Sequence, residues 1–174
     1  MFPTNFWITF LIALVPLAVG FLYYGPYGFH KAWMREASVT EEQVASGNML
    51  KIFGLSYLYS FFVALLLQMI VIHQYGLSGL FGMLSDQWLV EGSSLMTQLD
   101  ALDQEFNLYT RHMHFGHGAL HGGFTALAFI APILCINSLF ERKSWKYMAI
   151  HAGYWFVCLT LMGGLLAQFI KLPL

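Results

Sequence analysis

Residues 50–73 read LKIFGLSYLYSFFVALLLQMIVIH, and this stretch determines the class of fold. It contains a single charged residue, Lys51, at its beginning. A helix needs about 20 mainly apolar residues to cross a bilayer. Three further stretches meet this requirement, at residues 5–24, 115–140 and 145–170. The sequence therefore predicts an all-α protein, a polytopic four-helix bundle that forms one domain, residues 1–174, in the lipid bilayer.

The composition supports a membrane protein and excludes a nucleic-acid partner. Only 10% of the residues are charged, whereas a soluble domain carries about 25%. The formal net charge is -1, and no basic stripe that could follow a phosphate backbone occurs. Cys135 and Cys158 both lie in apolar stretches, where thiols usually behave as small hydrophobic groups, so a disulfide is not expected.

The distribution of basic residues predicts the orientation in the membrane. Six of the eight Lys and Arg residues fall in the first and third connections, which share one side: Lys31, Arg35, Lys51, Arg142, Lys143 and Lys146. Connections rich in Lys and Arg stay in the cytoplasm. We therefore expect both termini and the acidic connection 74–113 on the outer side, which for a bacterial inner membrane is the periplasm.

The connection 74–113 is long enough to contain structure of its own. Apolar residues recur in it at steps of four and three, the spacing of one helix face: Leu95, Leu99, Leu102, Phe106 and Tyr109. This pattern predicts an amphipathic helix across the outer mouth of the bundle. On the inner side, Thr40 and Gln43 have capping-box spacing, which predicts a short helix that continues into the second span.

Four histidines between residues 112 and 121 form the one constellation with obvious chemistry. At 100° per residue, three of them lie within about 60° on one helix face. Imidazoles at such spacing suit Zn, Cu, Ni or Fe. The predicted ligands are His114, His117 and His121, with His73, His112 and Asp103 as additional ligands. The alternative is that these rings bond to loop carbonyls or water at the membrane surface. Haem is disfavoured, because all the histidines lie near the ends of the spans.

Small residues predict where helices approach each other closely. Gly118 and Gly122 are four residues apart at the beginning of the third span. Gly163 and Gly164 lie deep in the fourth. Such small side chains let helix backbones pack together in a membrane, so we expect these glycines at a helix interface.

Several short motifs resemble a known family. The first span ends Tyr23-Tyr24-Gly25-Pro26, and Lys31 and Trp33 follow. The third span ends in residues 137–144, NSLFERKS, and the fourth contains Ala152-Gly153-Tyr154-Trp155. These motifs resemble the uncharacterised bacterial integral-membrane proteins catalogued as domain of unknown function 1761, at Tyr24, Pro26, Lys31, Trp33, Asn137, Phe140, Glu141, Arg142, Ser144, Gly153, Tyr154 and Trp155. The resemblance covers most of the chain except the outer connection, and it implies a four-helix membrane bundle without an established activity.

Three classes of function remain at this point. Small size and glycine-mediated packing surfaces favour an accessory, binding or assembly subunit, which packs against itself as a homo-oligomer or against a larger membrane complex. The first alternative is a metal-binding or redox membrane enzyme that uses the histidine cluster, with Asp100, Asp103 or Glu105 as a further ligand or base. The second is a small transporter, for which a charged residue well inside a span would be expected. The sequence contains no phosphate-binding glycine loop or CxxC motif.

Overall fold

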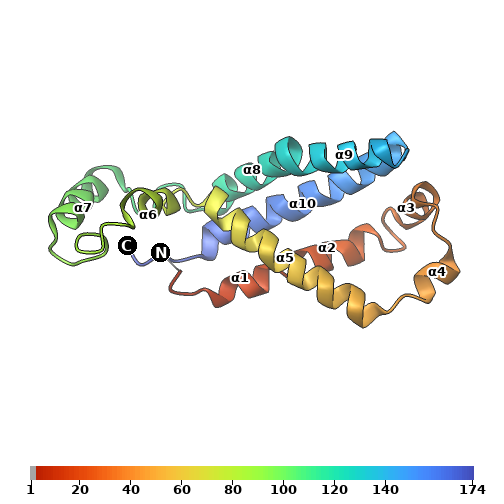
Figure 1. Ribbon diagram of the computed structural model, residues 1–174, viewed down its shortest axis with the longest axis horizontal. Helices are drawn as coiled ribbons and strands as arrows, with labels where there is room; N and C mark the ends of the chain where they lie inside the picture. The colour runs from red at the N-terminus through yellow and green to blue at the C-terminus, as the bar shows by residue number, and fades with distance from the viewer. Residues whose placement is uncertain (1–2) are drawn as a thin grey trace.

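The structure is a computed structural model that describes residues 3–174, and no strand occurs in this range (Figure 1). The predicted all-α class is therefore confirmed. In chain order the elements are α1 (Trp7–Ile12), α2 (Val15–Tyr23), α3 (His30–Ala37), α4 (Glu41–Ala45), α5 (Met49–Val71), α6 (Tyr75–Phe81), α7 (Ser94–Phe106), α8 (Phe115–Thr125), the π-helical segment η1 (Ala126–Ile130), α9 (Ala131–Phe140) and α10 (Trp145–Phe169).

Three helical stretches among the described residues are long and apolar enough to cross a membrane: α5, the continuous run from α8 to α9, and α10. The first predicted span is instead divided into α1 and α2, and Pro16 explains the division. Proline has no N–H to donate to the carbonyl four residues back, and its ring crowds that carbonyl. That carbonyl belongs to Ile12, where α1 ends.

A second proline accounts for η1. In a regular α-helix the carbonyl of Ala128 would bond to residue 132, but Pro132 has no donor. The chain widens by one residue at this turn, and the N–H of Ala131 donates to Ala126 O, five residues back. The helix therefore continues through the proline at the cost of one wide turn.

Helix α10 lies at the centre of the packing, and its most extensive neighbour is α8. Leu159, Met162 and Leu166 of α10 are fully buried in the main apolar core. Helix α5 contributes Leu67 and Val71 to the same core.

Glycines bring α8 and α10 into backbone contact. A Cβ added at Gly118 would lie 2.1 Å from Gly163 O, and one at Gly122 would lie 2.0 Å from Leu159 O. At Gly164 an added Cβ would lie 2.5 Å from the Phe115 ring. No side chain fits at these positions while the helices keep this separation.

Different elements lie at the two ends of the molecule. At one end Thr4 N donates to Lys171 O at 2.8 Å, so the first and last described segments of the chain lie together, beside residues 74–113 (Figure 1). We call residues 74–113 the lobe. The opposite end contains α3, α4 and the turn between α9 and α10, and we call it the basic end. Ser144 Oγ donates to a carboxylate oxygen of Glu36 at 2.5 Å there, which holds α3 against that turn.

The two short elements predicted from the sequence are present, with changed extents. Thr40 and Gln43 form the predicted capping box, but α4 ends at Ala45, and Asn48 caps α5 separately. Helix α7 covers most of the predicted amphipathic stripe, yet it lies at the far end of the lobe instead of across the mouth of the helices (Figure 1). At the beginning of α7, Ser93 Oγ donates to Gln87 O, which holds the helix to the preceding residues of the lobe.

Candidate metal centre

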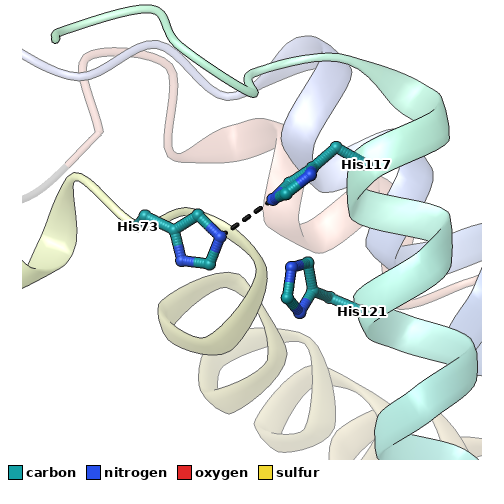
Figure 2. Close-up of side chains that lie close together, drawn as sticks. All are labelled: His73, His117 and His121. Carbon is teal, nitrogen blue, oxygen red and sulfur yellow. Dashed lines mark hydrogen bonds between the residues drawn. The ribbon is translucent and has the colours of Figure 1, made fainter.

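Three imidazoles from two separate segments meet at the lobe end (Figure 2). His73 follows the end of α5, and His117 and His121 lie on α8. One ring nitrogen from each can be chosen so that all three lie within 4.8 Å of one another. The Nε2 atoms of His73 and His117 are 2.8 Å apart, in hydrogen-bond contact.

The repeated His-Gly pair on α8 explains why two of the rings face α5. Gly118 and Gly122 face α10 at close range. The histidine that precedes each glycine is rotated by about 100° around the helix axis, and both histidines share one face because they are four residues apart. The same sequence repeat therefore builds the helix contact and presents the imidazoles beside it.

The position of His73 depends on how α5 ends. The helix stops at Val71, and Ile72 takes an extended conformation with φ -107° and ψ 100°. Ile72 is buried in the core, at 1% exposure. The following residue, His73, projects toward α8, and its ring centroid lies 4.9 Å from that of His121 (Figure 2).

His114 is near this group but has a different structural role. It is the N-cap of α8, with φ -148° and ψ 158°, and its Nδ1 accepts a hydrogen bond from His117 N. An N-cap residue lies outside the helical repeat, so the 100° count does not extend to it. The structure thus brings together His73, His117 and His121, whereas the sequence predicted His114 as a main ligand and His73 as an additional one.

The other predicted ligands lie around or away from the three rings. His112 stacks on His117, with ring centroids 4.4 Å apart. Asp103 lies in the lobe, where it accepts a hydrogen bond from Tyr109 N. The Tyr109 hydroxyl donates to Asp100 at 2.8 Å, and burial, followed by this hydrogen bond, raises the pKa of Tyr109. Both carboxylates therefore organise the lobe.

The geometry of the three rings suits a small tetrahedral cation. Metal-bound imidazole nitrogens lie about 2.0–2.1 Å from zinc, so two of them lie about 3.3 Å apart. The separation of 2.8 Å between His73 Nε2 and His117 Nε2 would open by about half an ångström, whereas a pair at the 4.8 Å limit of the group would have to close by about 1.5 Å. Three protein ligands leave the fourth position for water or another ligand. Beside His73 and His112 a pocket of about 280 Å³ is present.

The fold identifies the class of the protein. It is an all-helical chain with three helices long and apolar enough to cross a membrane. The chain belongs to the family described as "Protein of unknown function (DUF1761)", whose model matches residues 7–167. The resemblance found in the sequence is thereby confirmed. No curated protein and no solved structure matches the chain.

Several positions that resemble the family motifs gather at the basic end, away from the histidine cluster. The Tyr24 hydroxyl lies 3.0 Å from His151 Nδ1, and the Tyr24 ring packs against Trp33 and Tyr154. The hydroxyl of Tyr154 donates to Pro16 O. The contact between Tyr24 and His151 could not be predicted from the sequence, because 127 residues separate the two and no local spacing connects them.

Proposed function

We propose that this protein is a four-span integral membrane protein that binds a transition-metal ion through His73, His117 and His121. Zn²⁺ is the ion we expect to bind most tightly. One observation carries the proposal, namely the approach of three imidazole nitrogens to within 4.8 Å of one another from two separate segments. The expected role as an accessory or self-associating subunit is compatible with a metal site and stays a prediction.

The chemistry of the cluster supports a bound cation. Each neutral ring puts one nitrogen into the cluster, and that nitrogen is either a donor or an acceptor, so the three nitrogens cannot all pair in N–H···N bonds. Protonated rings at such distances repel one another. A divalent ion accepts lone pairs from all three nitrogens at once, and neutral imidazole is a good ligand for Zn, Cu, Ni and Fe.

The proposal is metal binding, without an assigned reaction. The group of ligand atoms contains no carboxylate among residues 3–174, and Asp100 and Asp103 are bonded to Tyr109. A metal-dependent hydrolase usually places a general base within hydrogen-bond reach of the metal-bound water. The contacts of these carboxylates give no support to such an arrangement.

The path of the first two helices supports four spans. Asn5 Nδ2 donates to Phe169 O at one end of α10, and the Tyr24 hydroxyl contacts His151 near the other end. The 18 steps along the helix from His151 to Phe169 of α10 cover about 27 Å at 1.5 Å per residue, close to the hydrocarbon thickness of about 30 Å. Helices α1 and α2 together therefore extend over the same depth as α10. The positive-inside rule places the basic end in the cytoplasm, so that in a bacterial inner membrane the metal centre faces the periplasm.

Elemental analysis tests the metal proposal directly. The protein is purified without a polyhistidine tag, stripped with chelator and titrated with Zn²⁺, Cu²⁺, Ni²⁺ and Fe²⁺. We expect one ion per chain in the wild type, and at least tenfold weaker binding in His73→Ala, His117→Ala and His121→Ala. The control is His30→Ala at the basic end, which should bind as the wild type does. A wild type that binds none of the four ions at micromolar concentration, or a His121→Ala variant of unchanged affinity, would overturn the proposal.

A further inference from the structure

The pocket beside the metal centre has walls of two kinds. Its lining includes apolar residues, Leu77 and Leu80 of α6 and Leu108 after α7, and polar residues, Arg111, His112 and His73. Its volume of about 280 Å³ is near the lower limit of small-molecule sites, which measure about 300–1,000 Å³. A short ligand that is apolar along its length and polar at one end matches these walls.

The charge in the pocket lining indicates the chemistry of the ligand's polar end. Arg111 is the cation of the pocket wall, and no carboxylate belongs to that wall. Within residues 3–174 Arg111 forms no ion pair, since the ion pairs found there are His30 with Glu41 and Arg35 with Glu36. A guanidinium beside apolar surface binds a carboxylate strongly, by two parallel hydrogen bonds.

The pocket is also held in shape by the chain around it. Gln74 is 5% exposed, and its amide nitrogen donates to Leu108 O at 3.0 Å and to Arg111 O at 2.9 Å. These bonds hold Gln74, which follows His73, against the segment 108–111, so two parts of the lining stay together. On α6, a Cβ added at Gly76 would meet nothing within 4 Å, so this part of the wall has open space beside it.

The location favours a ligand that partitions into lipid. The pocket begins two residues after α5 ends at Val71, at the level where a span of this length leaves the hydrocarbon. Leu80 is 75% exposed, and a hydrocarbon chain laid along it would remove this apolar surface from water.

We propose that the pocket binds a medium-chain fatty acid, with its carboxylate on Arg111 and its chain along Leu77, Leu80 and Leu108. His73 and His112 also line this pocket. The assignment does not depend on a bound metal, so it goes beyond the proposed function, and the two can fail separately.

Equilibrium dialysis of radiolabelled octanoate tests the proposal. The protein is held in phosphatidylcholine nanodiscs with chelator present, and empty nanodiscs measure the partition of octanoate into lipid. We expect saturable binding of one octanoate per chain, weakened at least tenfold in Arg111→Gln. The matched control is Lys171→Gln, which removes a positive charge at the same end of the molecule but outside this pocket, and which should change the affinity less than twofold. Octanol, which has the same chain and a neutral head, should not displace octanoate at equal concentration.

A second pair of variants tests the apolar side and does not rely on Arg111. Leu80→Ala should weaken octanoate binding several-fold, whereas Met83→Ala should not, because Met83 is 93% exposed in the same lobe and lies outside the pocket wall. Binding that equals that of empty nanodiscs, or that is the same in the wild type, Arg111→Gln and Leu80→Ala, would overturn the proposal. Octanoate binding by a protein that takes up no metal would leave this inference standing and remove the metal proposal alone.

Discussion

His114 and His117 are three residues apart on the chain and have different roles. His117 points from the helix toward His73 and His121, whereas His114 uses its ring to cap the helix that carries the other two. An imidazole that already accepts a hydrogen bond from a backbone N–H has one lone pair committed. Because α8 begins one residue after His114, the His114 ring is used as a cap, and the His117 and His121 rings remain free to bind a metal.

Substitution of His114 separates capping from metal binding. Loss of a cap costs about 1 kcal/mol, so His114→Ala should lower the thermal unfolding midpoint of the metal-free protein in detergent. His114→Ser, which supplies a better capping group, should restore the midpoint. Both variants should bind Zn²⁺ within about threefold of the wild type. If His114→Ser keeps its stability but loses Zn²⁺, then His114 is a ligand after all.

The sequence identified two of the three clustered histidines, and the third was foreseen only as an additional ligand. The spacing of His117 and His121 is local and can be read directly. The sequence placed His114 on the same helix face, whereas the helix begins one residue later and His114 caps it; histidine is not among the usual capping residues. His73 is 44 residues away from His117, and its approach depends on how α5 and α8 pack, which no local pattern encodes.

At the scale of elements, α8 and α10 form the tightest contact of the molecule. The glycines of α8 lie directly against the carbonyl groups of α10. Packing of this kind replaces side-chain interdigitation by a long backbone contact, which is favourable where lipid supplies no hydrophobic driving force.

A matched pair of glycine substitutions tests this contact. Gly122→Ala places a methyl group against Leu159 O and should destabilise the protein by about 1–3 kcal/mol. Gly54→Ala on α5 meets nothing within 4 Å, so it should leave stability unchanged or raise it by up to about 1 kcal/mol. Unfolding in increasing concentrations of denaturing detergent, followed by circular dichroism, measures both. Equal stability of the two variants would contradict the close approach of α8 and α10.

The attachment of α3 to the turn between α9 and α10 should depend on pH. The hydrogen bond from Ser144, followed by that from Arg35, lowers the pKa of Glu36 below its ordinary value, which is about 4.3. A lowered folded-state pKa gives stability that is complete above the ordinary value and is lost as the pH falls through the folded value. We therefore expect Glu36→Gln to lower the unfolding midpoint at pH 7 and to lessen its fall between pH 5 and 3.

Glu91→Gln serves as the control for Glu36, because Glu91 is exposed in the lobe. It should reproduce the pH profile of the wild type. A Glu36→Gln variant with the same profile as both would show that the Glu36 carboxylate does not hold α3 in place.

The extents of the elements were predicted well where apolar length alone decides them, and less well where proline does. The second, third and fourth apolar stretches correspond to helical runs within a few residues. Pro16 divides the first stretch, and Pro132 widens the third. Both prolines lie within apolar stretches, so the length of apolar sequence does not reveal their effect. Each proline leaves one particular carbonyl of the preceding turn without its backbone donor.

At the scale of the whole molecule, the two ends carry separate chemistry. The lobe end holds the clustered imidazoles and the pocket. The basic end holds the hydrogen bonds that join Tyr24 to His151 and Ser144 to Glu36. The apolar helices between them keep these two groups of contacts on opposite faces of a membrane in the proposed topology.

Cysteine labelling tests that topology. Asp86→Cys in the lobe and Glu42→Cys in α4 both replace exposed residues, and a Cys135→Ala background removes the less buried native thiol. In bacterial spheroplasts we expect a membrane-impermeant maleimide to label Asp86→Cys at once and Glu42→Cys only after lysis. Labelling of both residues in intact spheroplasts would contradict a four-span protein with its basic end inside.

The π-helical segment also limits how the length of this chain can vary. A π turn holds one residue more than the α turn that it replaces, so the helices on either side keep their directions while the chain between them is longer. A deletion of one residue within 126–130, combined with Pro132→Ala, would restore a regular helix and leave the glycine face of α8 in place. The same deletion in α10 would rotate every later residue by about 100° and turn Leu166 out of the core. A single-residue deletion is therefore expected to be tolerated at η1 when Pro132→Ala accompanies it, and not in α10.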